Sequence, residues 1–179
     1  MRLRRLSAQP HKKCLLSDVR LFHRPWDDQI AKGFMQKKEK DMSAIQITPG
    51  ETGEPRGGVI AYLQVEGTTK AAAFYEKAFG AKEVARHPVD EQGRTMHLHL
   101  YINGGSVMMS DPYPEYGHAY IKPAGITLTL CVDDVDFWWD RASKAEGMEV
   151  VMPLEKMFWG DRFGQLRDPF GYDWAIVGK

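Results

Sequence analysis

Two histidines, His97 and His99, stand one residue apart and are the side chains of this sequence best suited to chemistry. In an extended strand, residues two positions apart share a face, so both imidazoles would point the same way. Such a pair suits a divalent metal, but a third ligand is needed, and the loops offer only His118, Asp111 and Glu115 without a regular spacing. The pair is therefore open to two interpretations: metal ligands, or polar groups that line a pocket.

Cys131 and Arg162 are the other candidates for chemistry. A catalytic thiolate needs a neighbouring base or positive charge, which a histidine would have to supply, and the simpler interpretation of Cys131 is a small core residue. Arg162 belongs to the segment Trp159-Gly160-Asp161-Arg162. It either pairs with Asp161 and fixes a loop, or its planar guanidinium binds a carboxylate or phosphonate.

The elements that position these residues repeat along the chain. A shift of 67 residues superposes six apolar or glycine positions, namely Leu63 on Leu130, Val65 on Val132, Ala78 on Ala145, Gly80 on Gly147, Val84 on Val151 and Gly104 on Gly171. Each copy starts with an alternating strand (59–65 and 126–132), continues with an amphipathic helix that a glycine ends, and adds three short strand-like segments. The pattern predicts an α+β fold of two βαβββ modules, residues 58–111 and 125–178.

The predicted helices carry start and stop signals. Thr68 or Thr69 can cap the first helix and Asp134 the second, because their side-chain oxygens accept from the unpaired amides of the first turn. Gly80 and Gly147 suit the left-handed residue that ends a helix. We therefore expect the helices to stop at those glycines.

Alternation along the strands predicts which side chains face away from the helices. Leu63 and its neighbours at two-residue spacing should cover the first helix, and the same alternation runs through residues 96–102 and 126–132. The opposite, polar face would present Tyr62, Gln64, His97, His99, Tyr101, Thr127, Thr129 and Cys131. If two curved sheets confront each other, this face lines a cavity.

The chain has no net charge, because 24 basic residues balance 24 acidic ones, but the charges are unevenly divided. Residues 1–41 hold 11 basic and 5 acidic residues (net +6), whereas the rest holds 13 basic and 19 acidic residues (net −6). The acidic part repels phosphate, and no glycine-rich phosphate loop occurs, so we expect no nucleic-acid partner. No run of 18 apolar residues is present, so we expect no membrane span and a cytoplasmic location.

Residues 1–41 are interpreted as a basic leader, and residues 42–57 as a flexible lead-in to a domain at 58–179. Met42 opens the sequence Met-Ser-Ala-Ile-Gln like a bacterial start, and Lys38-Glu39, if coded AAG-GAG, would form a ribosome-binding sequence just upstream. On that hypothesis the natural protein begins at Met42. A solvated basic tail, an organelle transit peptide and a nucleic-acid-binding arm are the alternatives, and the aspartates of the segment oppose the transit peptide.

Three motifs accompany the repeat. Residues 74–80 read Phe-Tyr-Glu-Lys-Ala-Phe-Gly, residues 159–164 read Trp-Gly-Asp-Arg-Phe-Gly, and residues 168–171 read Asp-Pro-Phe-Gly. With the repeat, these motifs resemble the vicinal oxygen chelate superfamily of glyoxalases, bleomycin-resistance proteins and extradiol dioxygenases, and their wording is most similar to its PhnB-type subgroup. The resemblance covers residues 58–179 and implies a curved mixed sheet around a cleft between the modules, in a homodimer.

The resemblance also implies where a metal would be bound. Metal-dependent members of the family take ligands from the first and last strands of each module, at positions that fall here on Ile60, Met108, Thr127 and Ala175. None of these carries an imidazole, carboxylate or thiolate, the groups that divalent metals prefer. We therefore expect no cofactor, with a divalent metal at His97 and His99 as the alternative.

The predicted function is metal-independent binding of a small organic ligand in the cleft, without assigned catalytic residues. The ligand-binding set is Tyr62, Gln64, His97, His99, Tyr101, Met108, Thr129, Trp159 and Arg162. A metal-dependent lyase, isomerase or dioxygenase that uses His97 and His99 is the alternative. Tyr113, Tyr116 and Tyr120, in the connection between the modules, either form a lid or belong to a proline-stiffened linker.

Overall fold

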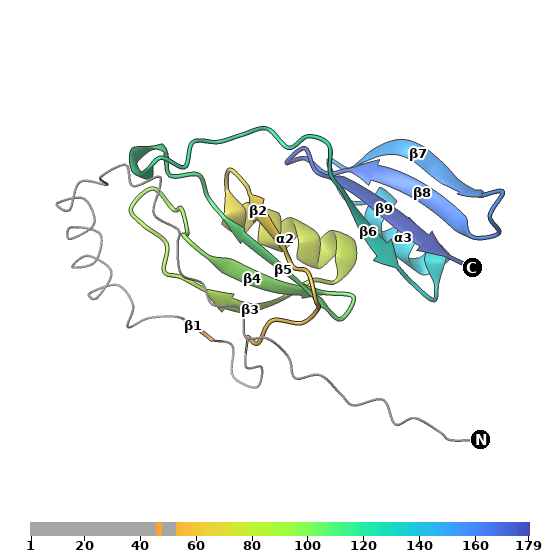
Figure 1. The fold of residues 1–179 in the computed structure, drawn as a ribbon, viewed down its shortest axis with the longest axis horizontal. Helices are drawn as coiled ribbons and strands as arrows, with labels where there is room; N and C mark the ends of the chain where they lie inside the picture. Colours follow the sequence, from red (N-terminus) through yellow and green to blue (C-terminus); the bar gives the residue numbers. More distant parts are fainter. Residues whose placement is uncertain (1–45, 48–52) are drawn as a thin grey trace, which may run out of the picture. The chain divides into compact units, whose positions relative to one another are not determined.

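The computed structural model describes residues 46–47 and 53–179, and these form two sheets with two α-helices (Figure 1). The first sheet has the strand order β1-β3-β4-β5-β2, and the second has the order β6-β9-β8-β7. The leader assigned to residues 1–41 and the start at Met42 lie outside the described residues, so these assignments and the domain boundaries stay predictions.

Each sheet belongs to one module. Module 1 consists of β2 (Ala61–Gln64), α2 (Thr68–Phe79), β3 (Lys82–Arg86), β4 (Leu98–Ile102) and β5 (Gly105–Ser110), and the two-residue strand β1 (Gln46–Ile47) pairs with β3. Module 2 consists of β6 (Thr127–Cys131), α3 (Val135–Ser143), β7 (Glu149–Lys156), β8 (Arg162–Arg167) and β9 (Asp173–Gly178). A short 3-10 helix, η1 (Pro114–Tyr116), lies in the connection. The predicted α+β fold of two βαβββ modules is confirmed.

The two modules have the same register. In module 1 the first and last strands are parallel and pair Tyr62 with Met108, and in module 2 they pair Thr129 with Ala175. Each residue of the second pair lies 67 positions after its counterpart. The sequence repeat is therefore a repeat of strand register, which places equivalent side chains at equivalent points of the two sheets.

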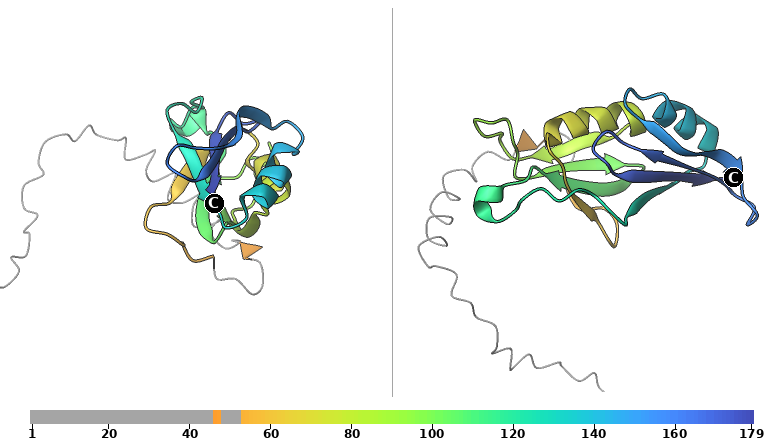
Figure 2. Two further views of the ribbon diagram at one scale, coloured as in Figure 1. Left: turned by 90° about the vertical axis from the view of Figure 1, so that its right-hand side faces the viewer. Right: turned by 90° about the horizontal axis from the view of Figure 1, so that it is seen from above.

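The two helices cover the same side of the strands and contact each other (Figure 2, right). Beneath them a single apolar core runs through both modules, as the contact of Phe79 with Trp174, at 4.4 Å between ring centroids, illustrates. Leu98, Leu100 and Ile102 of β4 belong to this core, as their alternation predicts, but His99 and Tyr101 on the opposite face are buried as well. Burying each such aliphatic side chain contributes about 1.5–3 kcal/mol to folding.

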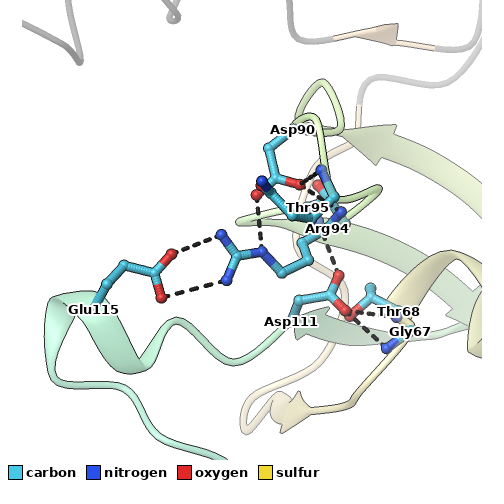
Figure 3. A network of polar contacts seen from close by, with 8 residues as sticks. Gly67, Thr68, Asp90, Arg94, Thr95, Asp111 and Glu115 are labelled. Carbon is cyan, nitrogen blue, oxygen red and sulfur yellow. Dashed lines mark hydrogen bonds and ion pairs between the residues drawn. The ribbon is translucent and has the colours of Figure 1, made fainter.

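Helix α2 begins differently from the prediction. Its N-cap is Gly67, which has no side chain to accept a hydrogen bond, and neither Thr68 nor Thr69 caps it. The buried carboxylate of Asp111 takes this role from the end of β5, since it accepts from the amides of Gly67 (2.8 Å) and Thr68 (3.2 Å), and also from Thr95 (Figure 3). The parallel pairing of β2 with β5 is what brings Asp111 to the start of the helix.

Helix α3 confirms one signal and contradicts another. Asp134 caps it as predicted, because its side chain accepts from the amide of Phe137. The helix nevertheless ends at Ser143, and Gly147, whose φ is +88°, lies in the following turn instead of stopping the helix. Gly80 does end α2 in the left-handed conformation, with φ +64°.

Among the described residues, no helix is long and apolar enough to cross a lipid bilayer.

Candidate functional site

Six of the predicted ligand-binding residues lie together on the polar side of module 1. The strand register places Tyr62 beside Met108, and Met108 beside His99. Alternation adds the remaining members of the group, Gln64, His97 and Tyr101, to the same face. The structure therefore brings this part of the predicted set together, while its role in binding stays a prediction.

Tyr62 and His97 contact each other on this face. The hydroxyl of Tyr62 lies 3.2 Å from Nδ1 of His97 and also 3.2 Å from the carbonyl oxygen of Met96. Burial lowers the pKa of His97, and the neighbouring His87 and His99 lower it further. Burial also raises the pKa of Tyr62. The pair consequently joins an uncharged phenol to an uncharged imidazole at neutral pH.

His99 is closed to a ligand in this conformation. It is 1% exposed, its Nε2 lies 2.8 Å from Oγ of Ser106, and its ring makes a further hydrogen bond with the backbone of Gly53. A metal at the two histidines would have to break these contacts as well as that of His97 with Tyr62. Within the described part of the chain, no three His, Cys, Asp or Glu side chains come together as a metal site.

Tyr101 is covered by the segment that precedes β2, residues 53–56, which we call the strap. Its hydroxyl donates to the carbonyl oxygen of Glu54 (2.7 Å), and the guanidinium of Arg56 lies 3.7 Å from the centre of its ring. The main chain of Arg56 is bound to Ser106 through two hydrogen bonds, of 2.7 and 2.9 Å. The strap thus covers one half of the polar face and leaves the half around Tyr62 open.

Gln64 is engaged with the connection between the modules. The nitrogen of its side-chain amide donates to the carbonyl oxygen of His118 (3.4 Å), and the oxygen of the same amide accepts from the backbone N–H of Ile121 (3.1 Å). The side chain therefore holds the connection against β2. A ligand that uses Gln64 would compete with both contacts.

The aromatic residues of the connection divide into two groups. Tyr113 is buried beneath Arg94, whose guanidinium lies 4.3 Å from its ring centre and also pairs with Asp90 and Glu115 (Figure 3). Burial raises the pKa of Tyr113 to about 12. Tyr116 and Tyr120 are exposed, so of the three tyrosines predicted for a lid these two lie at the surface.

The candidates of module 2 are more scattered. Thr129 and Cys131 are exposed on β6, which contradicts the interpretation of Cys131 as a core residue. Trp159 is half exposed in the turn between β7 and β8. Arg162 pairs with Asp136 of α3 at 2.6 Å and not with Asp161, so the predicted neighbour pair is wrong. Helix α3, and not the polar face, holds this arginine.

The positions implied for a metal also need correction. The residues that pair with Met108 and Ala175 in the first strands are Tyr62 and Thr129, two places after the expected Ile60 and Thr127. The corrected set is Tyr62, Met108, Thr129 and Ala175. It contains no imidazole, carboxylate or thiolate, so these residues do not fit the metal of metal-dependent relatives.

The two sheets meet along a seam, the boundary between residues 59–64 and 127–131. β2 and β6 each form the edge of their own sheet, and no backbone ladder joins them in the described structure. At one end the hydroxyl of Tyr172 accepts from the backbone N–H of Gln64 (3.1 Å) and donates to the backbone carbonyl oxygen of Gln64 (3.0 Å). At the other end the side-chain amide of Asn103 donates to the carbonyl oxygen of Cys131 (2.8 Å). Side-chain hydrogen bonds therefore join the two sheets at both ends of the seam.

A cavity of about 240 Å³ lies along this seam. Its apolar walls come from both modules, with Ala61, Ile102, Val107, Leu128, Leu130 and Trp174 among them. Asn103, Ser106 and Thr129 add polar groups. The cavity is open to solvent on one side and has a mixed lining, in which apolar walls stand beside hydrogen-bonding groups. Small organic molecules are bound by this combination of surfaces.

Of the residues around this cavity, only Thr129 belongs to the ligand-binding set predicted from the sequence. The signal that it overlooked is Asn103-Gly104, whose φ angles of +47° and +78° form the tight hairpin turn that Asn-Gly pairs favour. That turn aims the Asn103 side chain at β6. The other lining residues look like ordinary core positions in the sequence.

Comparison with known proteins agrees with this architecture. Residues 58–176 match the family described as Glyoxalase/Bleomycin resistance protein/Dioxygenase superfamily. An uncharacterized protein of Mycobacterium tuberculosis is 35% identical over 150 residues, which cover 80% of this chain and 82% of that protein. Among solved structures, protein PA1353 from Pseudomonas aeruginosa is 27% identical with a TM-score of 0.57, and the match covers 68% of this chain and 96% of that one. TioX from Micromonospora sp. ML1 is 26% identical with a TM-score of 0.54, covering 68% and 98%.

Structures of lower identity share the fold alone. A PhnB protein from Bacillus cereus is 21% identical with a TM-score of 0.52, covering 69% of this chain and 100% of that one. The fosfomycin resistance protein FosX from Listeria monocytogenes, complexed with Mn(II) and sulfate, is 17% identical with a TM-score of 0.52, covering 69% and 92%. The PhnB protein is therefore one of several structural neighbours, and one neighbour that shares the fold was solved with bound metal.

Proposed function

The chain belongs to the Glyoxalase/Bleomycin resistance protein/Dioxygenase superfamily, and we propose that it binds a small organic molecule between its modules without a metal ion. The observation that carries this proposal is the cavity of about 240 Å³ at the seam, to which both modules contribute apolar walls. The register pairs Tyr62–Met108 and Thr129–Ala175 support it, because they offer apolar contact surface and two hydroxyls where a metal site would need charged or imidazole ligands.

The open half of the polar face extends the proposed site. Tyr62 is 54% exposed there, so its ring offers a flat apolar surface beside the seam. His97, held against Tyr62, adds a nitrogen that can donate or accept a hydrogen bond. A ligand with a planar ring and one or two polar atoms would match this combination.

A homodimer is part of the proposal. Module 2 exposes several large apolar side chains, including Phe158 (97%), Phe137 (57%), Trp159 (50%) and Val150 (47%). Phe158 and Trp159 also contact each other, at 4.8 Å between ring centroids. Exposed apolar side chains that lie together are typical of surfaces that another protein covers. Sedimentation velocity at micromolar concentration tests the dimer, and a monomer at all concentrations would contradict it. A cytoplasmic location likewise stays a proposal, which fractionation of cells can test.

Binding to metal-free protein tests the main proposal. EDTA-treated protein, checked for metal by elemental analysis, is titrated with benzyl alcohol, phenol and indole while amide chemical shifts are followed. Ala61→Leu reduces the cavity, and Ala73→Leu, on the exposed side of α2, makes the same change away from it. We expect binding of at least one probe that Ala61→Leu weakens and Ala73→Leu preserves. Binding that appears only after metal is added, or that ignores Ala61→Leu, would overturn the proposal.

A further inference from the structure

Arg56 differs from the other arginines of the described residues. Five arginines are engaged by oxygen acceptors: Arg86 by Glu83, Arg94 by Asp90 and Glu115, Arg141 by the carbonyl oxygens of Glu76 and Lys77, Arg162 by Asp136, and Arg167 by Asp173. The guanidinium of Arg56, by contrast, has no ion pair with any described carboxylate. Its contact is the ring of Tyr101, at 3.7 Å from the ring centre.

The backbone and ring contacts fix Arg56 in place. Two hydrogen bonds join its main chain to Ser106, and the hydroxyl of Tyr101 is tied to Glu54 of the same strap. A guanidinium stacked on a ring keeps the N–H groups in its own plane free for an acceptor. The ring contact limits the conformations of this exposed side chain, which lowers the entropic cost of binding an anion.

Arg56 also lies next to the seam cavity. Ser106, its hydrogen-bond partner, lines that cavity, and Tyr101, its stacking partner, pairs with Ser106 across β4 and β5. Arg56 is close enough to His99 that its positive charge helps to lower the pKa of that imidazole, after the larger effect of burial. An exposed positive group without a described carboxylate partner therefore stands next to Ser106, a residue of the open and partly apolar seam cavity.

We propose that Arg56 binds the carboxylate of a small organic anion whose apolar part occupies the seam cavity. This inference rests on the proposed function and adds the chemical class of the ligand. Guanidinium and carboxylate form two parallel hydrogen bonds, which are stronger than uncharged ones. The arginine that the sequence suggested for an anion, Arg162, is neutralised by Asp136, so Arg56 takes that role.

The test compares three probes of one shape: benzoate, benzyl alcohol and benzylammonium. In the native chain we expect benzoate to bind more tightly than benzyl alcohol by about tenfold, which corresponds to one good charged contact. Arg56→Gln should remove that preference and leave the binding of benzyl alcohol unchanged. Arg86→Gln, the same change of charge on β3, is the matched control and should keep the preference.

The outcomes separate the two claims. If benzyl alcohol binds at the seam but benzoate binds no better, or if Arg56→Gln retains the preference, the role of Arg56 is wrong while the proposed function stands. If none of the probes shifts the amides around the seam, the proposed function fails and the role of Arg56 fails with it. Circular dichroism and thermal unfolding of both variants confirm that any loss is not a loss of fold.

Discussion

The hydroxyl of Tyr172 closes the free edge of β2, because it accepts from the backbone N–H of Gln64 at 3.1 Å and donates to the backbone carbonyl oxygen of the same residue at 3.0 Å. A side chain of module 2 thereby does what a neighbouring strand does inside a sheet. An unpaired edge invites association with other strands, and this contact protects it. The two modules are held together at this point without a continuous ladder between their sheets.

Removing that hydroxyl should weaken the link between the modules. We expect Tyr172→Phe to lower the free energy of unfolding by about 1–3 kcal/mol, since it leaves backbone groups of Gln64 unpaired in a largely buried position. Urea denaturation followed by tryptophan fluorescence measures the change. Tyr120→Phe removes the hydroxyl of an exposed tyrosine and should change the free energy by less than about 0.5 kcal/mol. Equal effects of the two variants would contradict the role of Tyr172.

Asp168 should be among the residues most sensitive to substitution. Its buried carboxylate accepts from the hydroxyl of Tyr75 (2.7 Å), the indole nitrogen of Trp174 (2.9 Å) and the amides of Phe170 and Tyr172 (2.9 Å each). Asp168→Ala leaves these four donors without their acceptor, so we expect a loss of about 3–5 kcal/mol, measured by urea denaturation.

Two further variants check that estimate. Asp140→Ala, at an exposed position of α3, should cost less than about 1 kcal/mol. Tyr75→Phe, which removes only one donor, should cost about 1–2 kcal/mol. A loss for Asp168→Ala no larger than that for Asp140→Ala would contradict the network.

Stability should fall in mild acid because two histidines favour their neutral forms. Burial lowers the pKa of both His97 and His99 in the folded protein, whereas an unfolded histidine titrates near about 6.5. Below that pH the unfolded chain binds more protons than the folded chain, so stability is present above it and is lost as the pH falls. We expect the free energy of unfolding to decrease between pH 7 and pH 5.

Variants assign this fall to its source. His97→Gln should make the decrease smaller, because one of the two groups no longer takes up a proton on unfolding. His118→Gln, at an exposed position of the connection, should leave the decrease as it is. Urea denaturation at several pH values measures all three proteins. A stability that rises on acidification over this range would contradict the lowered pKa values.

The sequence was informative where a pattern is local or repeated. The alternation of Leu98, Leu100 and Ile102 predicted which side chains of β4 enter the core. The offset of 67 residues predicted that positions in the two modules are equivalent, although the pairs formed, Tyr62–Met108 and Thr129–Ala175, differ by two places in the first strands from the positions expected. Both follow from periods that the backbone itself imposes, namely two residues in a strand and one module in a duplicated chain.

Contacts between distant segments escaped prediction. Asp111 caps α2 only because the parallel pairing of β2 and β5 brings it there, and a threonine at the helix start gave a misleading local signal. Arg162 reaches Asp136 across the module although Asp161 stands next to it in the chain. The cover that the strap lays over His99 and Tyr101 is made largely with backbone groups, which leave no pattern in the sequence.

Amide chemical-shift mapping of EDTA-treated protein with benzyl alcohol tests the central claim most directly. If the seam cavity is a metal-independent site, the amides of Ala61, Val107, Leu128, Thr129 and Leu130, which surround it, should shift in a saturable way. Ala61→Leu should reduce those shifts and Ala73→Leu should preserve them. Shifts confined to residues away from the seam, or shifts that require added Mn²⁺ or Zn²⁺, would contradict the claim.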